Sequence, residues 1–294
     1  MKWTDAPDAV LDAVNTHLGP VSAADDITAG SRADLTTVVT TPAGRVFVKA
    51  VRGIDFRMRL LRNETLIGAA TLPDLVPAVL AHVDLDDEDG TPWLVVMTEH
   101  VDGRPASLAP GSPDLDIVAG VLQDLAAVEA PPGVWSLARR WAATDWWQRC
   151  AEHSPGVVAG WDLDEMTRLS APVPALADGD RLVHSDLHPD QILITAAGPR
   201  VIDWGYVSAG AGWVDTALIT LRLIIAGHDP AAAEAWARGL PTGRDADPAT
   251  LDAFAAYLGG WWTHLAATRP GVAAQSARNW AEWRHCQRTT VAAG

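Results

Sequence analysis

Two carboxylates flank a short stretch of this sequence that has the pattern of a β-hairpin. Asp186 lies in His184-Ser-Asp-Leu-His-Pro-Asp-Gln-Ile-Leu-Ile, and Asp203 lies in Val201-Ile-Asp-Trp-Gly205, which is 203 − 186 = 17 residues further on. A hairpin brings its two ends together, so we expect both side chains to reach one site. Phosphoryl transfer uses such a pair, one carboxylate to accept a hydroxyl proton and another to hold magnesium against phosphates.

These segments resemble two motifs of the aminoglycoside phosphotransferase and choline kinase-like family. The first is similar to its catalytic loop, usually H-G-D-L-H-P-x-N-[IV]-L, and Ile-Asp-Trp-Gly is similar to its counterpart of the protein-kinase D-F-G. The resemblance implies that Asp186 is the catalytic base, that Asp203 is the main magnesium ligand and that His184 is a scaffold residue of the loop.

Two positions depart from the family pattern. Ser185 replaces the usual glycine, and Gln191 stands at 186 + 5, where the family has a metal-binding asparagine. Glutamine offers the same amide oxygen on a stem one methylene longer, so we expect Gln191 to ligate a cation or to contact phosphate.

The N-terminal half contains further matches to a kinase-like fold. Such a fold needs a strand lysine that reaches the α- and β-phosphates and a helix glutamate that holds it. Lys49 ends the apolar run Val46-Phe-Val, and Glu64 follows 64 − 49 = 15 residues later. By the same resemblance, Gly30 and Ser31 would form a nucleotide loop, where a glycine lets backbone N–H groups approach phosphate.

The apolar strand Trp93–Val101 resembles the family's linker between lobes. On this analogy the carbonyl of Glu99 and the N–H of Val101 contact adenine, while Leu193 and Ile202 form the floor beneath the base.

Asp215 opens the helical pattern that follows Asp-Trp-Gly. It matches the second aspartate of the family's G-D-P-x-x-D-[LV]-A, which implies hydrogen bonds to backbone N–H groups of the catalytic loop. An ordinary N-cap role for Asp215 fits the sequence equally well.

The remaining pattern predicts the elements that position these residues. Helical spacing covers 6–18 and 56–70, and strand-like runs cover 34–41, 45–51, 78–85 and 93–99. A hinge is expected at 101–105. Beyond residue 114 the chain is mostly helical, with an embedded hairpin over 191–203 and late helices near 213–227, 230–239, 248–267 and 271–290. We therefore expect an α+β, bilobal protein kinase-like fold, with an antiparallel-sheet N-lobe over 1–100 and a helical C-lobe over 101–294 that holds the catalytic loop and acceptor site.

Composition limits the partners. The 294 residues carry a net charge of −15 and a pI near 4.8, which argues against binding of nucleic acid or an anionic membrane through bulk charge. The start of the chain has no signal-peptide pattern, and Arg222 interrupts the most apolar run, 217–226. With only two cysteines, Cys150 and Cys286, a cytoplasmic location is the simplest expectation.

The acceptor site is expected in 139–165 and in the late helices, by the family resemblance. Acidic residues there could bind an amine, or they could form a solvated helix face: Asp145, Asp162, Asp164 and Glu165. Most of the 14 tryptophans suit core packing, although one or two could stack on a substrate.

The leading functional prediction is an ATP-dependent phosphotransferase that uses Mg²⁺ and phosphorylates a hydroxyl of a small molecule, aminoglycoside-like, sugar or amino alcohol. GTP is an alternative nucleotide, and a cationic acceptor would suit the acidic charge. A second hypothesis is a nucleotide-binding pseudokinase-like protein with little or no transfer, motivated by Gln191. A third is a metallohydrolase that uses His184, Asp186 and His188.

Overall fold

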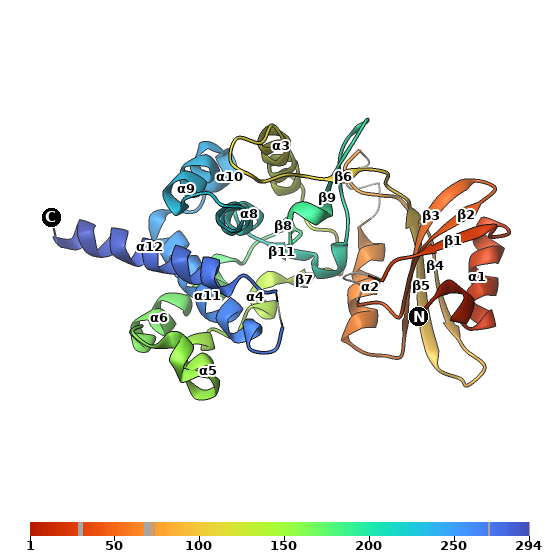
Figure 1. The fold of residues 1–294 in the computed structure, drawn as a ribbon, viewed down its shortest axis with the longest axis horizontal. Coiled ribbons are helices and arrows are strands. Elements are labelled where there is room, and N and C mark those ends of the chain that lie inside the picture. Colours follow the sequence, from red (N-terminus) through yellow and green to blue (C-terminus); the bar gives the residue numbers. More distant parts are fainter. Residues whose placement is uncertain (29–31, 68–71, 73, 270, 294) are drawn as a thin grey trace. The chain divides into compact units, whose positions relative to one another are not determined.

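The computed structural model describes residues 1–28, 32–67, 72, 74–269 and 271–293. By their contacts these residues form two units (Figure 1). The first comprises Met1–Ala106 with Asp190–Val207, and the second comprises Ser107–Pro189 with Ser208–Gly294.

The first unit is built on an antiparallel sheet of five strands in the order β1-β2-β3-β5-β4. The β-branched run and the turn at Pro42-Ala-Gly form the predicted hairpin of β2 and β3, in which Thr36 lies opposite Lys49. Strand β1 is acidic and was not expected from the sequence. The strand bounds are β1 Ala23–Asp26, β2 Leu35–Thr41, β3 Gly44–Arg52, β4 Val79–Asp86 and β5 Pro92–Glu99.

Alternate residues of this sheet face two different helices, because successive side chains of a strand point to opposite faces. In β5, Trp93, Val95 and Met97 join the core formed with helix α1 (Asp8–Leu18). Leu94 and Val96 join the core formed with helix α2 (Phe56–Leu66). Figure 1 shows α1 and α2 on opposite sides of the sheet.

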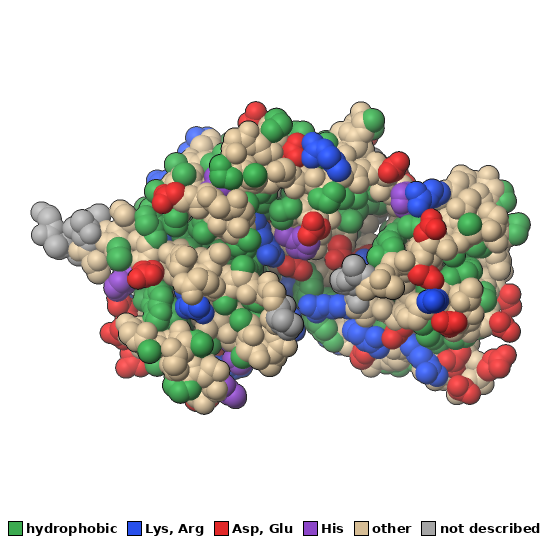
Figure 2. Space-filling view, viewed as in Figure 1, with side chains coloured by type: hydrophobic (Ala, Val, Ile, Leu, Met, Phe, Trp, Pro, Cys, Tyr) green, Lys and Arg blue, Asp and Glu red, His purple; other side chains and the backbone are tan. Residues whose placement is uncertain are grey.

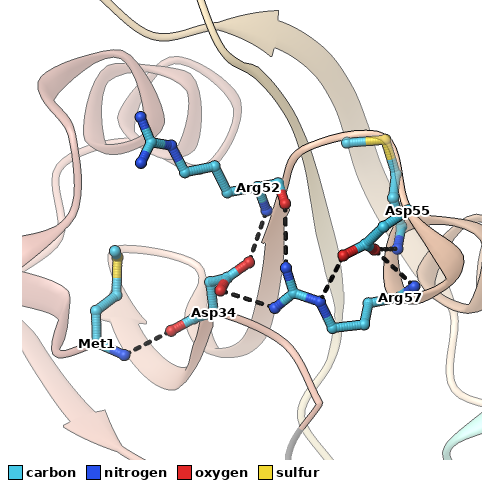
Figure 3. Close-up of polar contacts among 6 residues, drawn as sticks. Met1, Asp34, Arg52, Asp55 and Arg57 are labelled. Atoms are coloured by element: carbon cyan, nitrogen blue, oxygen red, sulfur yellow. Dashed lines mark hydrogen bonds and ion pairs between the residues drawn. The ribbon is translucent and has the colours of Figure 1, made fainter. Parts of the chain in front are cut away.

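Helix α2 begins at a well-defined cap. The side chain of Asp55 accepts hydrogen bonds from the N–H groups of Arg57 and Met58, which satisfies two of the unpaired donors at the helix start. Arg57 also contacts Asp34 at 2.8 Å, and Asp34 accepts a hydrogen bond from the N–H of Arg52 at the end of β3 (Figure 3). These contacts fix the start of α2 against the sheet. The helix was expected to reach residue 70 but ends at Leu66, because Ile67 adopts an extended conformation.

The hairpin of β9 (Ile192–Thr195) and β10 (Gly198–Val201) belongs to the first unit, although the sequence outline placed it within the helical part. Its strand β9 pairs with β6 (Arg104–Pro105), and the N–H of Val201 donates to the carbonyl of Leu75 at 2.7 Å. The predicted division of roles between 1–100 and 101–294 stays a prediction.

The second unit is mainly helical and has an aromatic core. The ring of Phe254 contacts the rings of Trp141, Trp213 and Trp280 at centroid distances of 5.7, 5.2 and 6.2 Å. These tryptophans are buried, as expected for residues that pack in the core. The helices are α3 Asp114–Ala127, α4 Leu137–Arg140, α5 Trp146–His153, α6 Leu163–Ser170, α7 Val173–Leu176, α8 Val214–Ile225, α9 Pro230–Gly239, α10 Pro241–Arg244, α11 Pro248–Ala266 and α12 Ala274–Ala293.

A small three-stranded sheet completes the second unit and leads into the predicted catalytic loop. Its order is β7-β11-β8, with bounds Trp135–Ser136, Ser208–Gly210 and Arg181–Val183. Among the described residues, no helix has both the length and the apolar character that crossing a membrane requires. Acidic side chains are spread over the visible surface of each unit, with Lys and Arg among them (Figure 2).

Candidate active site

Strand β3 presents Lys49 to helix α2. Val46, Val48 and Ala50 face α1, so the residues between them, including Lys49, face the other way. The ammonium of Lys49 lies 2.8 Å from Oε1 of Glu64 and 2.9 Å from Oδ1 of Asp203. The structure therefore brings together three residues that were singled out from distant parts of the sequence.

The charges of Lys49, Glu64 and Asp203 interact strongly with one another. Only 16% of the Lys49 side chain and 13% of the Glu64 side chain are exposed, against 53% for Asp203. Burial acts to lower the pKa of Lys49, but the charges and hydrogen bonds of Glu64 and Asp203 outweigh it, and the pKa is raised. Burial raises the pKa of Glu64, and Lys49 opposes that shift. The lysine is thus held in its cationic form, which suits phosphate binding.

Asp203 occupies an uncommon backbone conformation. Strand β10 ends at Val201, two residues earlier than expected, and Asp203 has φ 65° and ψ 57°. A residue with a side chain pays a steric cost in this left-handed region, and such residues concentrate at functional sites. The indole N–H of Trp204 donates to the carbonyl of Val201 at 2.9 Å and closes the turn around Asp203.

Gln191 lies beside Asp203. It ends a short 3₁₀ turn rather than starting the predicted strand, and it is 3% exposed. Its Nε2 lies 3.4 Å from Oδ2 of Asp203, while its buried Oε1 finds no hydrogen-bond partner among the described residues. A buried polar oxygen normally has a partner. An amide oxygen beside a carboxylate fits a hard cation such as Mg²⁺, which commonly takes one or two carboxylates and completes its shell with phosphates.

The predicted adenine-binding segment packs tightly on the hairpin of the same unit. The carboxylate of Glu99 contacts Arg200 at 2.6 Å, and a β-carbon placed on Gly103 would lie 3.1 Å from the carbonyl oxygen of Ile194. No described residue accepts a hydrogen bond from the N–H of Val101.

The other expected nucleotide contacts are placed only in part. Leu193 and Ile202 are partly buried side chains of the hairpin region. Gly30 and Ser31 lie outside the described residues. Their neighbour Arg32 is described, and it donates a hydrogen bond to the hydroxyl of Tyr206, just after Asp-Trp-Gly.

In the second unit, Asp215 binds the backbone of the predicted catalytic loop. Its Oδ2 accepts the N–H of His184 at 2.8 Å, and its Oδ1 accepts the N–H of Ser185 at 2.9 Å. Burial raises the pKa of Asp215, which these two bonds and His184 oppose. Asp215 lies inside α8, whose N-cap position is Trp213, so the geometry is that of the loop-bracing role rather than the N-cap role.

Two arginines beside this loop were not predicted. Nη1 of Arg140 lies 2.7 Å from Oγ of Ser185 and 2.6 Å from Oγ of Ser208. Nη2 of Arg222 lies 3.6 Å from Oδ1 of Asp186, whose side chain is 41% exposed. Asp186 and Asp203 belong to different units, so their meeting at one site stays a prediction.

The acidic residues considered for an amine-bearing acceptor are mostly engaged elsewhere. Asp145 pairs with Arg149 at 2.9 Å, Asp162 caps α6 by accepting the N–H of Glu165, and Glu165 pairs with Arg288. Asp164 is exposed. These are the contacts of a solvated helix surface.

Two other possible sites gain no support from the described residues. Within the described ranges no three His, Cys, Asp or Glu residues gather to hold a metal, so the metallohydrolase hypothesis has no ligand set there. A hollow of about 540 Å³ in the second unit is lined by Gln123, Arg181 and Thr242 among others, and by none of the predicted site residues.

Two comparisons relate this chain to known proteins by family and by fold. Residues 30–254 match the model of a family described as "Phosphotransferase enzyme family". A search of curated proteins finds no match to this sequence.

Solved structures with similar folds include three small-molecule phosphotransferases. A thermostable mutant of aminoglycoside phosphotransferase APH(4)-Ia, apo form, matches with a TM-score of 0.59 and 15% identity, over 94% of this chain and 99% of that one. Choline kinase LicA from Streptococcus pneumoniae matches with 0.56 and 13%, over 94% and 96%. Amicoumacin kinase hAmiN, with AMP-PNP, Ca²⁺ and Ami, matches with 0.58 and 12%, over 95% and 92%. At these identities the likeness concerns the fold, and the expected α+β, kinase-like fold is confirmed.

Proposed function

The chain belongs to the phosphotransferase enzyme family, and on that premise we propose that it transfers the γ-phosphate of ATP to a hydroxyl group of a small molecule. The observation that carries this proposal is the contact of Lys49 with both Glu64 and Asp203. A lysine held by a helix glutamate beside an aspartate is the phosphate- and metal-binding arrangement that kinases need.

The first unit would bind the nucleotide. Lys49 neutralises charge on the α- and β-phosphates, and Glu64 fixes the position of its ammonium. Asp203 and Gln191 would hold Mg²⁺, which when bound neutralises phosphate charge. This assignment is supported by Oε1 of Gln191, which is buried and has no hydrogen-bond partner among the described residues. The backbone of Glu99 and Val101 would receive the purine edge of ATP, with GTP as the alternative nucleotide, above Leu193 and Ile202. Gly30 and Ser31 would approach the phosphates.

Asp186 would act on the acceptor. The acceptor oxygen attacks the γ-phosphorus, the bond from phosphorus to the bridging oxygen breaks, and ADP leaves with that electron pair. The proton of the attacking hydroxyl passes to a carboxylate oxygen of Asp186. Because the transition state is loose, correct placement of that hydroxyl contributes more than the basicity of the carboxylate.

The acceptor is proposed to be an aminoglycoside-like compound, a sugar or an amino alcohol. Structural neighbours are named for an aminoglycoside, for choline and for amicoumacin, which are chemically diverse. The acidic chain favours a cationic acceptor through long-range attraction rather than through a dedicated carboxylate cluster. We also propose a cytoplasmic location, where ATP is available.

A transfer assay with γ-labelled ATP over aminoglycosides, sugars and amino alcohols tests the proposal. We expect one class to become labelled in the presence of Mg²⁺. Asp186→Ala should lower turnover by a factor of about 10² or more while Mg²⁺–nucleotide binding persists. Asp116→Ala removes an exposed aspartate of α3 and serves as the matched control. Tight nucleotide binding with no labelled acceptor would instead favour the pseudokinase-like alternative.

A further inference from the structure

A charged residue from an apolar helix lies beside the proposed base. Arg222 belongs to α8, in which Asp215 is the only other charged residue, and its side chain is 20% exposed. Its Nη2 lies 3.6 Å from Oδ1 of Asp186, which is an ion-pair distance but longer than a hydrogen bond. A guanidinium keeps its positive charge at every relevant pH, so Arg222 attracts the Asp186 carboxylate at every relevant pH.

An indole ring fixes the position of that guanidinium. The central carbon of Arg222 lies 4.7 Å from the ring centroid of Trp262, which comes from α11 and is 7% exposed. A cation over an indole face is attracted by the ring quadrupole, and more strongly where water is excluded. Trp262 therefore limits the orientations that Arg222 can adopt, and Arg222 is aimed at one oxygen of Asp186.

The second carboxylate oxygen of Asp186, Oδ2, is available to accept the proton of an acceptor hydroxyl. Oδ2 of Asp186 accepts no hydrogen bond from the described residues. The nearby carboxylate of Asp215 is committed to the backbone of His184 and Ser185, and it repels Asp186. Arg222 thus offsets a local excess of negative charge and occupies one side of the Asp186 carboxylate.

We propose that Arg222 is a positioning residue that orients Asp186 through Oδ1, so that Oδ2 faces the acceptor hydroxyl, and that Trp262 holds Arg222 in place. This inference rests on the proposed role of Asp186 and adds two residues to it. A carboxylate that can rotate freely is misplaced for part of the time, and misplacement of about 1 Å can cost about 10²-fold in rate.

The test is steady-state kinetics of the full chain with the acceptor found in the screen. Arg222→Met keeps the aliphatic stem and removes the charge, and we expect kcat to fall about 10- to 100-fold. The nucleotide KM and the Mg²⁺–nucleotide Kd should change less than about twofold, because Arg222 is not assigned to the nucleotide. Arg222→Lys should recover part of the loss, and Trp262→Phe should lose less than Trp262→Leu. Arg62→Met removes an arginine–aspartate pair on the surface of the first unit and serves as the control.

A double-mutant cycle separates positioning from a general structural role. In an Asp186→Ala background, Arg222→Met should lower the residual rate no further, since the group that it positions is gone. Equal losses in both backgrounds, or unchanged kcat in Arg222→Met with native melting behaviour, would overturn the inference and leave the proposed function intact. If Arg222→Met fails to fold, Arg222→Lys and the two Trp262 variants decide the same question. Full transfer activity in Asp186→Ala would instead overturn the proposed function.

Discussion

The guanidinium of Arg140 donates a hydrogen bond of 2.7 Å to the hydroxyl of Ser185, a residue whose backbone has φ 61°. The contact explains how this chain carries a serine where the family pattern has glycine. A non-glycine residue in the left-handed region costs about 1 kcal/mol or more, and the hydrogen bond to a charged donor offsets that cost.

The two effects at Ser185 can be separated by substitution. Ser185→Ala keeps the strained backbone and loses the hydrogen bond, so we expect its unfolding free energy to fall by about 1–3 kcal/mol. Ser185→Gly loses the same bond but relieves the strain, and should be more stable than Ser185→Ala by about 1 kcal/mol. Urea unfolding of the three proteins measures both values. Equal stability of the two variants would show that the φ of Ser185 carries no cost.

Asp215 should be needed for the shape of the proposed catalytic loop. Asn at this position offers one acceptor oxygen, whereas the carboxylate serves the N–H groups of both His184 and Ser185. We expect Asp215→Asn to lose about 1–3 kcal/mol of stability and to lower kcat more than the nucleotide KM. Thermal melting and kinetics check the two effects. If Asp215→Asn keeps native stability and native kcat, the hydrogen bonds of Asp215 to the loop are not needed for either.

The charge cluster of Lys49 should contribute stability that depends on pH. Its folded pKa is raised, so the contribution is complete below the unfolded lysine value near 10.4 and is lost as pH rises toward the folded value. The difference in unfolding free energy between wild type and Lys49→Met should therefore be flat from about pH 7 to 10 and should shrink at higher pH. Denaturant unfolding across this range measures it. A difference that grows above pH 10 would contradict the assignment.

Gln191 offers a test of the metal role that separates binding from folding. Gln191→Leu removes a buried amide whose Oε1 lacks a partner among the described residues and whose Nε2 makes only a long contact of 3.4 Å with Asp203, so stability should change little. The Mg²⁺ concentration for half-maximal transfer should rise about tenfold, as for loss of a ligating oxygen. Removal of divalent ions with EDTA should abolish transfer by the wild type. A variant with lower stability and an unchanged Mg²⁺ requirement would assign Gln191 to folding alone.

The two cysteines should differ sharply in reactivity. Burial raises the pKa of the Cys150 thiol to about 11, and only 3% of this residue is exposed. Cys286 is exposed. Because the thiolate is the reactive species, one equivalent of iodoacetamide should react at pH 8 in the native protein, and the second only after unfolding. Mass spectrometry locates the label, and a Cys286→Ser variant should stay unlabelled when native. Rapid labelling of Cys150 would show that its surroundings open.

Much of the fold could be predicted because its signals are local. The β-branched runs, the turn at Pro42-Ala-Gly and the helical spacing after residue 114 each indicate one element, and the structure contains those elements. Strand β1 was missed because Ala-Ala-Asp-Asp has no strand propensity. It forms through pairing with β2, in which Asp25 lies opposite Val38.

The residues of the candidate site that belong to sequence motifs could be predicted, whereas the residues around them could not. Lys49, Glu64, Asp203 and Asp215 follow a known order along the chain, but Arg140 and Arg222 belong to no motif. Arg222 had one signal: it interrupts an otherwise apolar helix, and a charge in such a position usually has a partner. The identity of that partner, Asp186, depends on packing between α8 and the loop, which no local pattern encodes.

Because successive side chains of strand β3 point to opposite faces, the number of residues before Lys49 decides which helix Lys49 faces. Adding or deleting one residue between Val46 and Lys49 would leave a strand that still pairs and is still apolar on both sides, yet the lysine would be turned toward α1 and away from Glu64. A two-residue change would restore its side. Natural variation in this segment is therefore expected to come in even steps, because an odd step would part the ammonium of Lys49 from Glu64 and Asp203.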